Sequence, residues 1–101
     1  MADALRIERV DAGHVRVAGR LGFAEAAAAL ARSEELLDAN AREVAVDVRA
    51  LEGIDSATLA VLLAWTARAR TCGTVLHLTD VPVGLRALAH LCDAEPLLGI
   101  G

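Results

Sequence analysis

The spacing of apolar and polar residues predicts two short strands at the start of the chain. Apolar and charged side chains alternate over residues 5–10, and alternation returns over residues 14–18. The Asp-Ala-Gly segment 11–13 stands between them, and glycine readily adopts the backbone angles of a tight turn. We therefore expect a β-hairpin, followed by a loop over residues 19–22.

After the hairpin, the pattern alternates between helical and extended segments. Apolar residues at helical spacing predict helices over residues 23–39, 56–70 and 82–95. Alternating, β-branched residues predict a strand over residues 44–48, and a further strand is expected over residues 75–78. We expect the strand at 44–48 to be central and covered on at least one face. Helix and strand in alternation favour parallel strands joined by right-handed crossovers.

The ends of these elements carry local signals. Asn40 is a plausible stop for the first helix, and Cys72 with Gly73 closes the second. Pro82 suits the first turn of the third helix, because proline lacks the N–H that would be unpaired there, and Pro96 is expected to end it. We expect residues 50–53 to form a loop. The predicted fold is α/β, in the order β-β-α-β-α-β-α, with a mixed sheet of about four strands.

Composition narrows the classes of function. The chain has 101 residues, which predicts one domain over residues 1–101, and aromatic residues make up only 2% of it, so its core must be aliphatic. Ten scattered Arg residues, no Lys and a net charge of −4 argue against a nucleic-acid-binding face. Apolar runs too short for membrane insertion and a charged N-terminus predict a cytoplasmic protein, where Cys72 and Cys92 would stay reduced.

Catalytic and metal-binding patterns are missing from the sequence. It has no GxSxG, phosphate-binding P-loop or HExxH motif, and His14, His77 and His90 do not share a metal-ligand spacing. Asp47 and Asp55 could form a carboxylate pair, but a strand end and a helix cap explain them more simply. We therefore expect no enzymatic activity, no metal and no cofactor.

The most informative segment is the one in which a strand ends and Asp55-Ser56 opens a helix. Asp and Ser are among the commonest N-cap residues, which makes capping the simplest interpretation of both. A helix N-terminus also favours negative charge, so the same place could accept a phosphate or an acidic group of a partner.

This segment resembles the signature of the STAS family. The usual form is an apolar-Asp strand, a short loop, then Asp-Ser-small-Gly-Leu at the start of an apolar helix. This chain has Val-Asp-Val at 46–48 and Asp-Ser-Ala-Thr-Leu at 55–59. The predicted element order and the length agree as well, so the resemblance covers nearly the whole chain.

Two positions depart from the family pattern. In the family members that are switched by phosphorylation, the modified Ser or Thr lies two residues after the Asp, and here that position is Ala57. Regulation at this position is therefore expected to be absent, with Ser56 and Thr58 as the only neighbouring hydroxyls. Thr58 also replaces the glycine of the family, which puts a side chain where a partner would approach the backbone.

The resemblance implies a protein-binding function. The Asp-Ser-Ala start, the apolar stretch 59–65 that ends in Trp65 and the segment 85–91 are most similar to the small STAS subunit of Mla-type lipid ABC transporters. The implied partner is the cytoplasmic ATPase of such a transporter, whose assembly or activity the subunit supports at the inner face of the membrane. The alternative is an anti-sigma-factor antagonist that binds an anti-sigma kinase.

The second helix is apolar on two sides. The side expected to face the sheet carries Leu59, Leu62, Leu63 and Thr66, and the opposite side carries Ala57, Val61, Ala64 and Trp65. Either a partner covers this opposite side, or the last helix or the tail does. We predict the first, and a homodimer through the same helix stays open. The predicted partner-binding residues are Asp55, Ser56, Ala57, Thr58, Val61 and Trp65.

Overall fold

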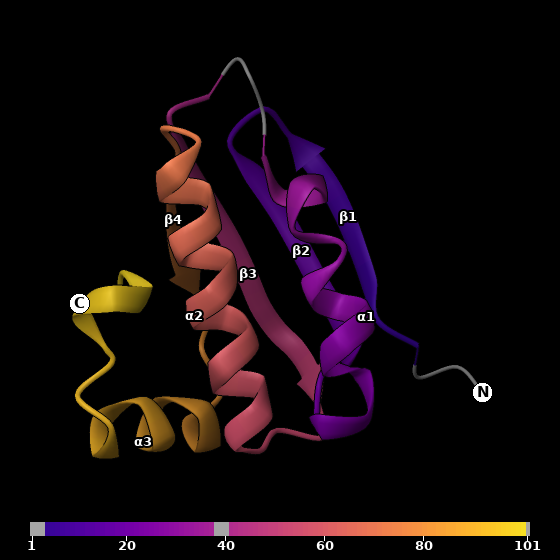
Figure 1. Cartoon of the computed structure of the whole chain (residues 1–101), viewed down its shortest axis with the longest axis vertical. Coiled ribbons are helices and arrows are strands. Elements are labelled where there is room, and N and C mark those ends of the chain that lie inside the picture. The colour runs from indigo at the N-terminus through magenta and orange to yellow at the C-terminus, as the bar shows by residue number, and fades with distance from the viewer. Residues whose placement is uncertain (1–3, 38–40, 101) are drawn as a thin grey trace.

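The computed structural model describes residues 4–37 and 41–100 and shows a four-stranded mixed sheet (Figure 1). The strands are β1 (Arg6–Asp11), β2 (His14–Arg20), β3 (Glu43–Glu52) and β4 (Val75–Thr79), and they lie in the order β1-β2-β3-β4. β1 and β2 form the predicted antiparallel hairpin, while β2–β3 and β3–β4 are parallel. The predicted α/β class, strand number and central position of β3 are confirmed.

Two strands run further than the sequence pattern indicates. β2 continues through Gly19 to Arg20, and β3 continues to Glu52, so the loops expected at 19–22 and 50–53 are partly strand. The reason is pairing between the strands: Gly19 lies opposite Leu51 and Arg20 lies opposite Glu52. Such pairing satisfies the backbone hydrogen bonds of residues whose own propensity favours a turn.

The prediction of one continuous helix over residues 23–39 is wrong. The segment contains a short 3₁₀ turn η1 (Phe23–Glu25), a brief helix α1 (Ala26–Leu30) and a second 3₁₀ turn η2 (Ser33–Leu36). Arg32 interrupts the helix, because its guanidinium donates 2.9 Å to the Leu5 carbonyl and also pairs with Glu35. Tertiary contacts here outweigh the high helix propensity of the alanines. The expected stop at Asn40 lies outside the described residues.

The other helices begin and end by recognisable local signals. α2 (Ser56–Thr71) is the long helix predicted from the apolar spacing, and α3 (Val83–Leu91) follows β4. Pro82 is the N-cap of α3 and does not lie inside its first turn. α3 ends well before Pro96 because Asp93 takes a left-handed backbone angle, with φ of 53°. Pro96 instead begins a third 3₁₀ turn, η3 (Pro96–Leu98).

The helices cover one face of the sheet. In Figure 1, α1 and α2 lie in front of the strands, and α3 crosses the lower end of α2. Val44, Val46 and Val48 of β3 are fully buried under this layer, while Arg49 on the other face is exposed. Within the described residues, no helix is long and apolar enough to cross a membrane.

Candidate functional site

The segment singled out by the sequence lies at the carboxyl end of the central strand β3, where the chain turns into α2. Asp55 is the N-cap of α2, and its Oδ1 accepts hydrogen bonds from the backbone N–H groups of Ala57 at 2.9 Å and Thr58 at 3.1 Å. Ser56 is the first residue of the helix and is exposed. The expectation of capping is therefore met by Asp55, because its carboxylate can reach two of the unpaired N–H groups at once. For Ser56, which already lies inside the helix, the expectation of capping is wrong.

Asp55 also ties α2 to the segment that precedes α1. Its second oxygen, Oδ2, accepts a hydrogen bond from the backbone N–H of Phe23 at 3.1 Å. This bond, together with the bonds from Thr58 and Ala57, lowers the pKa of Asp55 below its ordinary value, although partial desolvation opposes the shift. The helix N-terminus thus holds a built-in carboxylate, which disfavours the binding of a second anion at the same N–H groups.

Thr58 supports this cap from the inside of the domain. Its hydroxyl accepts a hydrogen bond from the Asp55 N–H at 3.0 Å and donates to the carbonyl of Leu21. The side chain is completely buried. The expectation that Thr58 presents a side chain to a partner is therefore wrong, because this side chain points into the domain, and its hydroxyl is inaccessible to a phosphoryl donor.

Trp65 and Val61 are core residues, and the prediction that they lie on an outward side of the second helix is wrong. Trp65 is 2% exposed and Val61 is 1% exposed. The indole Nε1 of Trp65 donates a 2.9 Å hydrogen bond to the carbonyl of Ala29 in α1. α1 supplies cover on this side of α2, because the carbonyl of its Ala29 accepts this bond. The Ala-rich segment packs on this side of α2 because its own apolar residues also need to be buried.

The side of α2 that meets solvent is a different one. It carries small or polar residues, namely Ser56, Ala60, Ala64, Ala67 and Thr71. Leu63, which was expected to face the sheet, is only half-buried at the border of this side. Leu59, Leu62 and Thr66 are buried as expected. Ala64 is exposed, although it was grouped with Val61 and Trp65.

Two exposed apolar side chains lie at the same end of the molecule as the start of α2. Phe23 begins η1 and is 83% exposed, and Val83 begins α3 and is 86% exposed. Figure 1 shows the starts of η1, α2 and α3 together at the lower end. We call Phe23, Ser56 and Val83 the helix-start surface. Sequence reasoning missed both apolar members: Phe23 falls inside the helix predicted over residues 23–39, where apolar residues were expected to be buried, and Val83 follows a proline without further signal.

The three histidines outside this end form separate pairs, each with one carboxylate. His14 lies 3.2 Å from Asp11, and His77 lies 3.1 Å from Glu43. His90 contacts a carboxylate in the same way, that of Glu95. Over residues 4–37 and 41–100, no group of three or more His, Cys, Asp or Glu side chains is arranged to hold a metal ion.

The two aspartates considered as a pair belong to different networks. Asp47 lies on the face of the sheet opposite the helices and accepts a 2.9 Å hydrogen bond from the Arg49 N–H, whereas Asp55 caps α2. The two cysteines, Cys72 and Cys92, are both exposed and free.

Comparison with known families agrees with this architecture. The family model described as "Mlab, STAS domain" matches residues 5–99. The chain belongs to the STAS family. No curated protein matches it.

Two solved structures share the fold of this STAS domain. The anti-sigma factor antagonist SpoIIAA in its unphosphorylated form has a TM-score of 0.70 and 15% identity over 93% of this chain and 84% of that one. The Bacillus cell fate determinant SpoIIAA in its phosphorylated form has a TM-score of 0.61 and 14% identity over 93% and 87% of the two chains. At this identity the likeness shows the fold alone. Ala57, at the position that the resemblance gives to the phosphorylated residue, is half-buried.

Proposed function

We propose that this STAS domain is a non-enzymatic subunit that binds the cytoplasmic ATPase of a Mla-type lipid ABC transporter and supports its assembly or activity. The observation that carries the proposal is the match of residues 5–99 to the family model described as Mlab. Such a partner would hold the domain at the inner face of the cytoplasmic membrane.

The helix-start surface is the part of the domain that we assign to this partner. Phe23 and Val83 leave large apolar side chains in water, and Ser56 at the start of α2 is also exposed. Burying a side chain of this size stabilises a complex by about 1.5 to 3 kcal/mol, and aromatic residues are frequent hot spots of interfaces. Asp55 contributes by holding the Phe23 backbone against the start of α2. Thr58, Val61 and Trp65 are buried and lie outside this contact.

The alternative function, binding of an anti-sigma kinase, is favoured by the likeness to SpoIIAA. The switch by phosphorylation is disfavoured by Ala57, which has no hydroxyl, and by Thr58, whose hydroxyl is buried. Ser56 is the one exposed hydroxyl over residues 55–58.

Binding titrations with two purified partners separate the two functions. The partners are a Mla-type ATPase and an anti-sigma kinase encoded in the same genome as this chain. We expect the ATPase to bind and the kinase not to bind. Intact mass after incubation with the kinase and ATP should stay unchanged. Binding of the kinase with stoichiometric phosphate on Ser56 would establish the alternative.

Charged substitutions test the surface itself. Phe23→Glu and Val83→Glu should each weaken binding of the ATPase by roughly thirtyfold, the equivalent of about 2 kcal/mol. Val10→Glu is the matched control, since Val10 is also an exposed apolar residue, at 54%, but lies on β1. If all three substitutions weaken binding of the ATPase equally, or if none of them weakens it, the ATPase binds elsewhere.

A further inference from the structure

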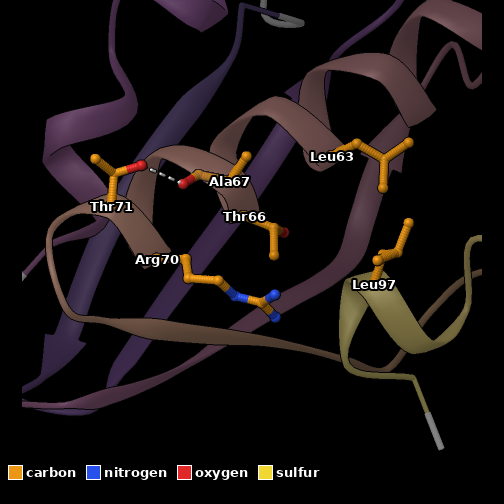
Figure 2. Close-up of a pocket in the computed structure, with 6 residues that line it drawn as sticks. All are labelled: Leu63, Thr66, Ala67, Arg70, Thr71 and Leu97. Carbon is orange, nitrogen blue, oxygen red and sulfur yellow. Dashed lines mark hydrogen bonds between the residues drawn. The ribbon is translucent and has the colours of Figure 1, made fainter.

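An apolar hollow of about 420 Å³ lies beside the C-terminal half of α2, away from the helix-start surface. η3 forms its other wall, next to the middle of α2 in Figure 1. The lining residues, shown in Figure 2, are Leu63, Thr66, Ala67, Arg70, Thr71 and Leu97.

The walls of this hollow are apolar in character, because its hydroxyl groups are used within the helix. Thr66 donates to the Leu62 carbonyl at 2.9 Å, and Thr71 donates to the Ala67 carbonyl at 3.0 Å. The hydroxyl proton of each threonine is therefore already donated within α2 and is not available to a ligand. Leu97 on the opposite wall is 53% exposed. An occupant would meet mainly aliphatic surface that is now in contact with water.

The wall formed by η3 is held in place before any ligand arrives. Leu98 is completely buried, and the N–H of Ile100 donates 3.0 Å to the carbonyl of Glu95. Gly99 has a φ of 72° and packs so closely on His77 that a Cβ would lie 3.0 Å from the His77 Cα. A wall that is already ordered reduces the conformational entropy lost on binding.

Arg70 is the only charged residue among the described residues that line the hollow. Figure 2 shows its side chain extending from α2 toward the wall that carries Leu97. The guanidinium of Arg70 makes no ion pair or hydrogen bond within the described part of the chain, in contrast to that of Arg68, which pairs with Glu34 at 3.1 Å. α2 itself contains no acidic residue to neutralise it. A guanidinium beside apolar surface is complementary to a carboxylate that is attached to an apolar group.

We propose that this hollow binds an amphipathic helix of a partner protein, with a leucine-like residue in the hollow and an acidic residue on Arg70. A helix fits because the exposed side of α2 next to the hollow carries small residues, namely Ala60, Ala64 and Ala67. Small residues allow a second helix to approach closely. A helix antiparallel to α2 would place its N-terminal turn, where acidic residues are favoured, beside Arg70. The proposal is independent of the identity of the partner at the helix-start surface.

A displayed library of helical peptides is the direct test. The peptides, of about 18 residues, carry a fixed leucine stripe, and each neighbouring position varies among Asp, Glu, Lys, Arg and Ser. Selection on the parent domain should enrich Asp or Glu at one position. Arg70→Glu should weaken the selected peptides by about tenfold or more, and fresh selection on this variant should enrich Lys or Arg at the same position.

Arg86→Glu is the matched control, because Arg86 is exposed on α3 and undergoes the same change of charge. It should leave the affinity of the selected peptides unchanged, and thermal denaturation should show all variants folded. The proposal is overturned by absence of enrichment, by enrichment without an acidic preference, or by equal effects of Arg70→Glu and Arg86→Glu. Sedimentation that shows a dimer disrupted by Ala67→Glu would also overturn it, since a second copy would then fill the hollow.

Discussion

Trp65 joins α2 to α1, and its replacement by alanine is expected to destabilise the whole domain. The indole is 2% exposed and belongs to the main core cluster. Its Nε1 donates to the carbonyl of Ala29, the one backbone group of α1 to which it is bonded. Trp65→Ala therefore removes the largest buried side chain and leaves this carbonyl without its partner.

The magnitude follows from both losses. Truncation of a buried Trp to Ala typically costs about 3 to 5 kcal/mol, with the cavity included. The total free energy of unfolding of a domain of this size is only about 5 to 15 kcal/mol. Each kcal/mol lowers the Tm of a domain of up to about 100 residues by roughly 4 to 8 °C. We expect Trp65→Ala to lower the Tm by at least about 12 °C.

The assay is thermal and urea denaturation followed by far-UV circular dichroism, because Trp65 is the only Trp and its fluorescence disappears in the variant. Trp65→Phe keeps much of the apolar contact but lacks the N–H donor, so a loss of about 1 to 3 kcal/mol is expected from the unpaired carbonyl. Phe23→Ala is the matched control: it removes an aromatic side chain that is 83% exposed, and its effect should stay within about 0.5 kcal/mol.

A Tm for Trp65→Ala close to that of Phe23→Ala would refute this reasoning. It would mean that the indole does not contribute to folding stability and that the packing of α1 on α2 does not stabilise the domain. A variant Trp65→Phe as unstable as Trp65→Ala would contradict the magnitudes instead, because the hydrogen bond would then outweigh the apolar contact.

Two further predictions concern the cap of α2 and the tail. The pKa of Asp55 is lower in the folded state than the ordinary value of 3.8, so its stabilisation is present above that pH and is lost as the pH falls through the folded pKa. Asp55→Ala should lower the Tm at pH 7, and the difference in Tm between variant and parent should become smaller in acid. A difference in Tm that stays constant from neutral to strongly acidic pH would contradict this. Gly99→Ala should destabilise the domain by more than about 1 kcal/mol in urea, because Gly99 has positive φ and no room for a Cβ. Gly84→Ala, where a Cβ meets open space on α3, should instead be neutral or stabilise by up to about 1 kcal/mol, and equal behaviour of the two variants would show that the tail is not held as described.

Local physical chemistry made much of the fold predictable from the sequence. Alternation along β3 buries Val44, Val46 and Val48 on one face, and this period of two is a property of any extended chain. The cap at Asp55 is equally local, since its carboxylate bonds to N–H groups two and three residues ahead. The parallel pairing of β2 with β3 and of β3 with β4 follows from the alternation of strands and helices.

Tertiary structure decided which face of each element is covered, and by what. Helical spacing places Val61 and Trp65 together, but only the position of α1 makes them core residues and leaves Ala64 in water. The same packing breaks the first helix at Arg32, whose guanidinium reaches the distant carbonyl of Leu5. Periodicity reports which side chains share a direction. The neighbour in that direction is chosen by the free energy of packing the whole chain, which no single segment contains.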